Sequence, residues 1–142
     1  MKRYLLLNGP NLNRLGQREP DVYGSETLTD IEQSLTELVE SYGCKLASHQ
    51  SNHEGKLIDW IHEAEGNYDG IIFNPGAYTH TSIALRDAIS SVSVPVIEVH
   101  ISNVYKRESF RHTSLLAPVC FGQVVGLGSK GYKLAALAFL QE

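Results

Sequence analysis

Two side chains capable of proton transfer, Glu98 and His100, are separated by one residue at the end of an apolar segment that begins at Pro95. On a strand, side chains two residues apart share a face. A carboxylate beside an imidazole raises the imidazole's pKa and fixes its tautomer, which suits the ring to acid–base work. A charged residue within an apolar strand is costly unless it is paired. The pattern therefore favours a proton-transfer pair, although Glu-x-His alone has low specificity.

A second polar segment, Asn74–Ser82, follows the apolar run Gly70–Phe73 and contains hydroxyls, amides and His80. A helix is expected to begin just beyond it, and the amides at a helix N-terminus can hold a carboxylate or another anion. Thr81 or Ser82 could equally be an ordinary N-cap. The segment predicts an anion site or a capped turn, and its sequence leaves both open.

A third polar segment, Asn8–Gly24, is unusually long. It separates the first apolar run from the first helix by about twenty residues, where roughly two to six are usual. Its glycines and prolines could act as hinges, so we expect a mobile lid over an active site at about residues 9–26. The alternative is a flexible surface loop anchored by one tyrosine, Tyr23.

The elements that must position these segments alternate between short apolar runs and amphipathic stretches. Five alternations predict a doubly wound α/β fold, flavodoxin-like, with a five-stranded parallel sheet of order 2-1-3-4-5 and helices on both faces. Thr29 and Glu32 have the spacing of a capping box. The expected strands are Tyr4–Leu7, Lys45–Gln50, Gly70–Phe73, Pro95–Val99 and Gln123–Leu127, and the expected helices are Thr29–Tyr42, Glu54–Glu65, Ser82–Ser91 and Lys130–Leu140.

In such a sheet, ligands bind beyond the carboxyl ends of the strands near the topological switch point. The three polar segments follow the first, third and fourth expected strands, so we expect them to meet there. At 142 residues, the chain fits a single domain over residues 1–142.

Composition excludes several classes of protein. The formal charge is −4 and there is no run of basic residues, which argues against nucleic-acid binding. The N-terminal apolar run Tyr4–Leu7 is shorter than the roughly 7 to 15 residues of a signal peptide's core, and nothing approaches a membrane span. We therefore expect a cytoplasmic protein. Cys44 and Cys120 lack CxxC spacing and are expected to be reduced, although their number alone would permit a disulfide.

Metal and imine chemistry are not expected. His49 and His53 have a ligand-like interval, but that interval brings two ligands together only on a helix, and the residues between them are typical of a strand end and turn. No lysine ends an apolar strand in the way a buried imine-forming lysine should.

Taken together, the motifs NGPNLNxLGxRxPxxYG, NPGAxTHTS and EVHISN, followed by Arg107-Glu108-x-Phe110-Arg111 and a terminal GLGxKGY, resemble the type II 3-dehydroquinate dehydratases over nearly the whole chain. The resemblance implies a lyase that converts 3-dehydroquinate to 3-dehydroshikimate through an enolate. The route is the shikimate pathway of chorismate and aromatic amino acid biosynthesis, or quinate breakdown. It implies no cofactor and no metal.

The resemblance also implies roles for individual residues. Tyr23 would be the base, and Arg18 would supply the positive charge that its ionisation needs, because free tyrosine has a pKa near 10. Asn11 would position a water at the enolate oxygen. His100 would protonate the leaving hydroxyl, with Glu98 orienting the ring.

The same resemblance implies a binding set and an assembly. Ile101 and Ser102 would hold the substrate carboxylate through main-chain amides, while Asp87 would reach across a subunit interface to a neighbouring site in a dodecamer, a tetramer of trimers. The implied substrate-binding residues are Asn74, His80, Asp87, Ile101, Ser102 and Arg111.

Three other classes share parts of this pattern. A phospho-receiver needs acidic residues after the first strand and an aspartate after the third, where this chain has Asn8 and Asn74. A flavodoxin-like FMN carrier needs a short Ser/Thr-rich phosphate loop in place of the long segment. A non-catalytic interaction module leaves Glu98 and His100 unexplained.

Overall fold

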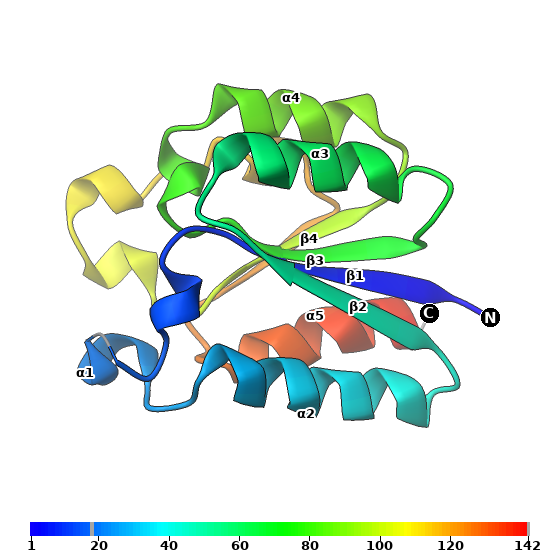
Figure 1. Cartoon of the computed structure of the whole chain (residues 1–142). Coiled ribbons are helices and arrows are strands. Elements are labelled where there is room, and N and C mark those ends of the chain that lie inside the picture. The colour runs from blue at the N-terminus through cyan, green and yellow to red at the C-terminus, as the bar shows by residue number, and fades with distance from the viewer. Residues whose placement is uncertain (18, 142) are drawn as a thin grey trace.

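Five parallel strands form one sheet in the order β2-β1-β3-β4-β5 (Figure 1). The computed structural model describes residues 1–17 and 19–141. Every neighbouring pair of strands is parallel, so the predicted flavodoxin-like order is confirmed. The strands are β1 Arg3–Asn8, β2 Lys45–Gln50, β3 Gly70–Asn74, β4 Val96–His100 and β5 Gly122–Val125.

Helices cover both faces of the sheet. Helices α2 (Leu28–Ser41) and α5 (Lys130–Leu140) pack on one face, and α3 (Glu54–Ala64) and α4 (Ile83–Ser91) pack on the other (Figure 1). The connections at the carboxyl ends of the strands contain short helical turns. These are η1 Leu12–Arg14, α1 Pro20–Tyr23, η2 Gly76–His80, η3 Val104–Lys106, η4 Ser109–Arg111 and η5 Ala117–Val119.

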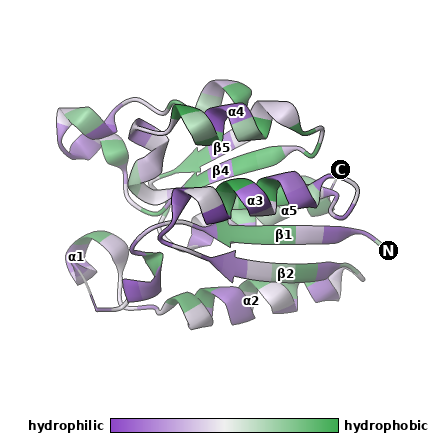
Figure 2. Cartoon of the chain, turned by 45° about the horizontal axis from the view of Figure 1, so that its top comes forward, coloured by the Kyte–Doolittle hydropathy of each residue, from purple (hydrophilic) through white to green (hydrophobic). Residues whose placement is uncertain are grey.

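The central strands are buried on both faces, which explains their continuous apolar runs. In β1, Tyr4 and Leu6 pack toward α2 and α5, while Leu5 and Leu7 pack toward α3 and α4. Figure 2, coloured by hydropathy, contrasts these apolar strands with the amphipathic helices around them, which carry both hydrophilic and hydrophobic residues. The two apolar clusters hold the sheet rigid, so that the strand ends have fixed positions.

The first long helix, α2, begins at Leu28, one residue earlier than predicted. Thr27 is its N-cap: the Thr27 hydroxyl accepts from the Asp30 amide at 3.2 Å, and the Asp30 carboxylate accepts from the Thr27 amide at 3.1 Å. The predicted capping box of Thr29 and Glu32 is therefore wrong. Both pairs have the required spacing, and the earlier one is used because Leu28 then packs against the core as part of the helix.

The last strand is also shorter than predicted, ending at Val125 rather than at Leu127. Gly126 has φ of +86°, a left-handed conformation that ends the extended chain. The expected lid segment is not a continuous loop, because it contains η1 and the short helix α1.

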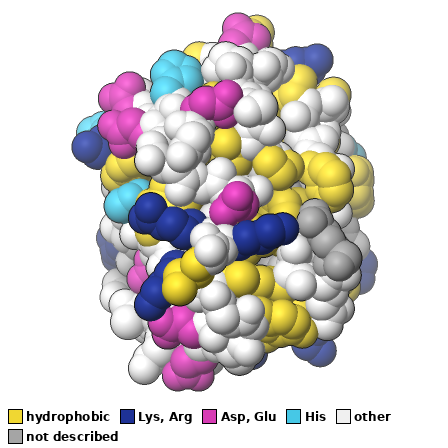
Figure 3. All heavy atoms as spheres, turned by 90° about the vertical axis from the view of Figure 1, so that its right-hand side faces the viewer, with side chains coloured by type: hydrophobic (Ala, Val, Ile, Leu, Met, Phe, Trp, Pro, Cys, Tyr) yellow, Lys and Arg dark blue, Asp and Glu magenta, His cyan; other side chains and the backbone are white. Residues whose placement is uncertain are grey.

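Figure 3 shows the face at the amino ends of the strands, where basic and acidic side chains are scattered among hydrophobic ones. This face lies opposite the strand ends that the sequence singles out. Within residues 1–17 and 19–141, no helix is both long and apolar enough to cross a membrane.

Gly9 allows the segments after β1 and β3 to approach each other closely. The Gly9 amide donates to the Asn74 carbonyl at 2.8 Å, and a Cβ atom at Gly9 would lie only 2.6 Å from the Pro75 carbonyl oxygen. Only glycine fits at this distance without moving the backbone of one segment.

We expect Gly9→Ala to lower the free energy of unfolding by roughly 1–3 kcal/mol, the range for overpacking a tight site. The matched control is Gly55→Ala in α3, where a Cβ would meet nothing within 4 Å and alanine favours the helix. Urea unfolding of both variants measures the effect. Equal stability of the two variants would contradict the close approach.

Candidate active site

A cavity of about 110 Å³ lies at the carboxyl ends of β1, β3 and β4. Its walls come from the three polar segments that the sequence singles out and from the continuation of the one after β4, which contains Val104, Arg107 and Arg111. Of the predicted site residues, those that line the cavity are Asn11, Tyr23, Asn74, His80, His100, Ile101, Ser102 and Arg111. The sequence prediction that these segments converge is confirmed.

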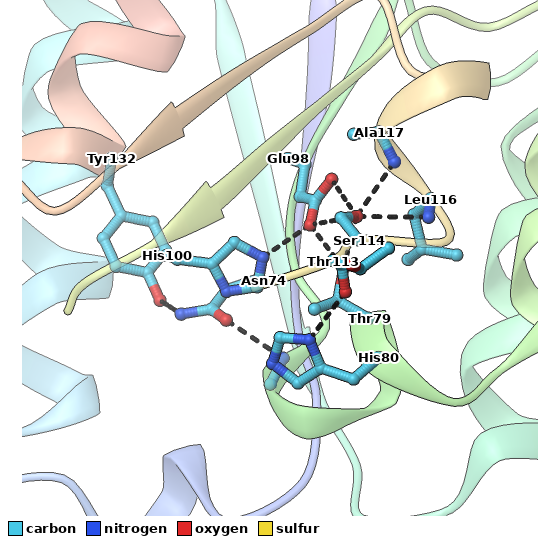
Figure 4. A network of polar contacts seen from close by, with 11 residues as sticks. Asn74, Thr79, His80, Glu98, His100, Thr113, Ser114, Leu116, Ala117 and Tyr132 are labelled. Atoms are coloured by element: carbon cyan, nitrogen blue, oxygen red, sulfur yellow. Dashed lines mark hydrogen bonds and ion pairs between the residues drawn. The ribbon is translucent and has the colours of Figure 1, made fainter. Parts of the chain in front are cut away.

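Glu98 lies behind His100 and is completely buried. The His100 Nε2 atom is 2.5 Å from Glu98 Oε2, and the hydroxyls of Thr79 and Ser114 also donate to this carboxylate (Figure 4). Burial acts to raise the pKa of Glu98, but hydrogen bonding and charge from His100, aided by both hydroxyls, outweigh burial and hold the pKa below its ordinary value. Glu98 is therefore an ionised acceptor.

An ionised carboxylate can only accept, so the tautomer of His100 follows from this contact. Nε2 carries the proton that Glu98 accepts, and Nδ1 is the ring nitrogen left for a ligand. The carboxylate thus fixes both the plane and the tautomer of the imidazole. This is the arrangement that the Glu-x-His spacing on β4 predicts.

Ser114 is a site residue that sequence reasoning missed. Its hydroxyl accepts from the backbone amides of Leu116 at 3.1 Å and Ala117 at 2.9 Å, and it donates to both carboxylate oxygens of Glu98 at 2.9–3.0 Å. Nothing in the local sequence signals this role, because the segment folds back onto β4 only in the tertiary structure.

His80 lies opposite His100, with the two ring centroids 6.4 Å apart. Its Nδ1 donates to the Thr113 carbonyl, with 2.9 Å between the two atoms. Burial lowers the pKa of His80, against the opposing effect of that carbonyl, so the ring is neutral at physiological pH. Its Nε2 atom is then an acceptor.

Tyr23, at the end of α1, lines the cavity and contacts an arginine to which the sequence prediction assigns no role. Arg107 Nη1 donates to the Tyr23 hydroxyl at 2.7 Å and to Ser102 Oγ at 3.3 Å. The guanidinium carbon also lies 5.3 Å from the centre of the Tyr23 ring. Arg18, the predicted source of positive charge, lies outside the described residues.

Arg107 is held in place by charge as well as by these hydrogen bonds. Its side chain is only 16% exposed, and its guanidinium lies within 4 Å of carboxylate oxygens of Glu19 and Glu108. The sequence contains a signal for it, because Arg107 belongs to the same motif as Arg111, but the motif alone does not say which arginine faces the tyrosine.

The remaining predicted residues are Asn11, Arg111 and Asp87; the first two line the cavity and the third does not. Asn11 has a left-handed φ of 70° and donates from its backbone amide to Asn52 Oδ1 at 3.0 Å. Arg111 is held by Glu108 through a 3.0 Å hydrogen bond. Asp87 is exposed on α4 and does not line the cavity of its own chain, so its role at a neighbouring site stays a prediction.

Two negative observations concern the residues that the structure describes. Every lysine is exposed, and none lines the cavity. Outside residues 18 and 142, no group of three or more His, Cys, Asp or Glu side chains is arranged to hold a metal ion. Cys44 and Cys120 are free thiols, and burial raises the pKa of Cys120 to about 12.

Comparison with known proteins gives a consistent result. The family described as dehydroquinase class II matches residues 2–140. A Halalkalibacterium halodurans protein named 3-dehydroquinate dehydratase is 63% identical over 141 residues, which cover 99% of this chain and 97% of that protein.

Solved structures show the same likeness. A type II dehydroquinase from Butyrivibrio crossotus superposes with a TM-score of 0.94 at 51% identity, covering 99% of this chain and 98% of the other. One from Propionibacterium acnes superposes with a TM-score of 0.96 at 41% identity, covering 100% and 98%. The chain therefore belongs to the dehydroquinase class II family.

Proposed function

We propose that the chain is a cytoplasmic hydro-lyase that dehydrates 3-dehydroquinate to 3-dehydroshikimate in the shikimate pathway. The observation that carries the proposal is that Tyr23 and His100 line one cavity. The cation of Arg107 lies beside Tyr23, which must act as an anion, and the anion of Glu98 lies beside His100, which must act as a cation. The names of the similar proteins support the substrate.

Tyr23 is the base in this proposal. Its phenolate takes the proton next to the ring ketone, and the electrons of that C–H bond form the enolate. A cation that donates to the phenolic oxygen favours the phenolate over the phenol, and Arg107 donates to it at 2.7 Å. Asn11, which lines the cavity, holds a water that hydrogen-bonds to the developing enolate oxygen.

His100 is the acid that completes the elimination. The enolate collapses as the C1–O bond breaks, and the hydroxyl leaves as water with a proton from the imidazolium of His100. Glu98 stabilises that imidazolium and keeps its ring oriented. Tyr23 ends the reaction with one more proton and His100 with one fewer. Tyr23 must therefore lose a proton and His100 must regain one before the next turnover.

The remaining cavity residues bind the substrate. The main-chain amides of Ile101 and Ser102 face the substrate carboxylate, and Asn74 and Arg111 reach ring hydroxyls. Neutral His80 can accept from a hydroxyl through Nε2. The segment 9–26 acts as a lid that carries Tyr23 to the substrate.

The route needs neither an imine nor a metal ion. The exposure of every lysine supports the first part, because an imine-forming amine must lie in the cavity. We further propose a dodecamer of four trimers, in which exposed Asp87 reaches a neighbouring site.

Tyr23→Phe tests the base. Ultraviolet absorbance follows formation of the enone from 3-dehydroquinate, and we expect an absorbance rise with the wild-type protein. The variant should lose at least about 10²-fold in kcat, because general-base catalysis contributes that much or more. It should keep most of its substrate affinity. If assembled wild-type protein gave no rise in absorbance, the proposed function would be wrong. Near-normal turnover by the variant would contradict only the assignment of Tyr23 as the base.

Arg107→Ala tests the cation beside the base. It removes the cation that donates to the Tyr23 hydroxyl, so kcat at pH 7 should fall about tenfold or more. Lys106→Ala is the control, since Lys106 is a neighbouring cation that is exposed and does not line the cavity. If Arg107→Ala kept the wild-type kcat, as Lys106→Ala should, Arg107 would have no such role.

Glu98→Gln tests the carboxylate behind His100. We expect kcat to fall by about 10²-fold or more, as for lost acid–base catalysis. The folded-state pKa of Glu98 lies below its ordinary value, so its contribution to stability is present above about pH 4.5 and is lost as the pH falls through the lowered pKa. Urea unfolding at pH 7 and pH 4 should therefore show a smaller acid loss in this variant than in wild type.

Glu40→Gln is the control for the pH effect, because Glu40 is exposed on α2 and should leave the acid loss unchanged. A Glu98→Gln variant with the full wild-type acid loss would show that Glu98 does not contribute to it.

A further inference from the structure

Tyr132 connects the layer formed by α2 and α5 to Asn74 in the wall of the active site. Its ring lies on α5, is 1% exposed, and packs in the apolar cluster between the sheet, α2 and α5. Its hydroxyl accepts from Asn74 Nδ2 at 2.9 Å (Figure 4) and donates to Asn8 Oδ1 at 2.6 Å. Asn8 and Asn74 are paired at the carboxyl ends of β1 and β3. Tyr132 does not line the cavity, whereas Asn74 does.

The hydrogen bonds of this group have a single consistent direction. The Gly76 amide donates to Asn74 Oδ1 at 3.1 Å, so this oxygen is an acceptor and Asn74 Nδ2 must face Tyr132. The Tyr132 oxygen then accepts from Asn74, and its proton must go to Asn8 Oδ1. Burial raises the pKa of Tyr132, so the hydroxyl keeps the proton that this direction requires.

Asn8 is a costly residue at its position. It is completely buried, and among the residues described its Nδ2 atom has no hydrogen-bond partner. A buried amide with an unsatisfied donor is less stable than an apolar side chain of similar shape. What Asn8 supplies is an acceptor at Oδ1, which orients the Tyr132 hydroxyl.

We infer that Tyr132 is a positioning residue that fixes the side-chain amide of Asn74 in one orientation, so that Asn74 presents an N–H donor to the substrate. Asn74 Oδ1 is occupied by Gly76 and one Nδ2 proton by Tyr132, which leaves the second Nδ2 proton for the ligand. Without the hydroxyl, Asn74 Nδ2 loses the acceptor that Asn8 orients, and only the Gly76 amide still holds the side-chain amide in place. The inference rests on the proposed function for the identity of the ligand, a hydroxyl of 3-dehydroquinate.

Tyr132→Phe removes the hydroxyl and keeps the ring. We expect KM for 3-dehydroquinate to rise about tenfold with kcat changed less than about threefold, because a lost binding hydrogen bond acts on ground state and transition state alike. Phe139→Leu is the control for stability: Phe139 is buried on the same helix but contacts Gly70 at the other end of β3. It should lower stability and leave KM unchanged.

A double-mutant cycle separates positioning from a general structural role. If Tyr132 acts through Asn74, then adding Tyr132→Phe to Asn74→Ala should raise KM by less than about twofold. A tenfold rise in both backgrounds, or an unchanged KM in Tyr132→Phe, would overturn the inference. If Tyr132→Phe does not fold, Asn8→Ala takes its place, because it removes the acceptor that orients the hydroxyl and should raise KM in the same Asn74-dependent way.

A measurement that does not depend on turnover keeps this inference separate from the proposed function. In amide NMR spectra of the ligand-free protein, the Asn74 Nδ2 proton that Tyr132 accepts should be resolved and protected from solvent exchange. Tyr132→Phe should collapse that protection, while Phe139→Leu should leave it intact. If the wild-type protein lacked dehydratase activity and Tyr132→Phe still lost the protection, the proposed function would be refuted and the positioning role would stand. Retained protection in Tyr132→Phe would refute the positioning role.

Discussion

The buried charge of Glu98 is the constraint on which the active site depends. A carboxylate with no exposure is stable only if donors surround it, and here they come from three parts of the chain: His100 on β4, Thr79 in η2, and Ser114 before η5. Satisfying this one charge therefore fixes the segments after β3 and β4 relative to each other. The contact between His100 and this charge also orients the His100 imidazole.

The two halves of the site are built differently. His100, the proposed acid, stands on a sheet that is packed on both faces, and it is hydrogen-bonded to buried Glu98. Tyr23, the proposed base, lies on a long connection, where it is half-buried and is held by a side chain from another segment, Arg107. A proposed base on a segment separate from the sheet suits a reaction in which substrate must enter before the base can reach it.

Much of the fold and the candidate site could be predicted from the sequence. Residue pairs two apart on strands, apolar runs that stop at polar residues, and helical periodicity are local properties, so the spacing of Glu98 and His100 is enough to predict their pairing. The choice between the Thr27 and Thr29 capping boxes could not be made locally, because both have the spacing and only the packing of Leu28 decides. The roles proposed for Tyr23 and Asn11 rest on the family resemblance and not on residue patterns.

By itself, the sequence determined the layered architecture, the strand order typical of its class and the edge of the sheet where polar residues gather. Only the tertiary structure decided which atoms meet at that edge. Arg107 reaches Tyr23 across 84 residues and Tyr132 reaches Asn8 across 124. No local pattern encodes such contacts, because they depend on how the helices pack against the two apolar faces of the sheet. That packing brings side chains from distant segments to one place. The result is a tyrosine whose partner is Arg107 and an asparagine whose orientation depends on the far layer.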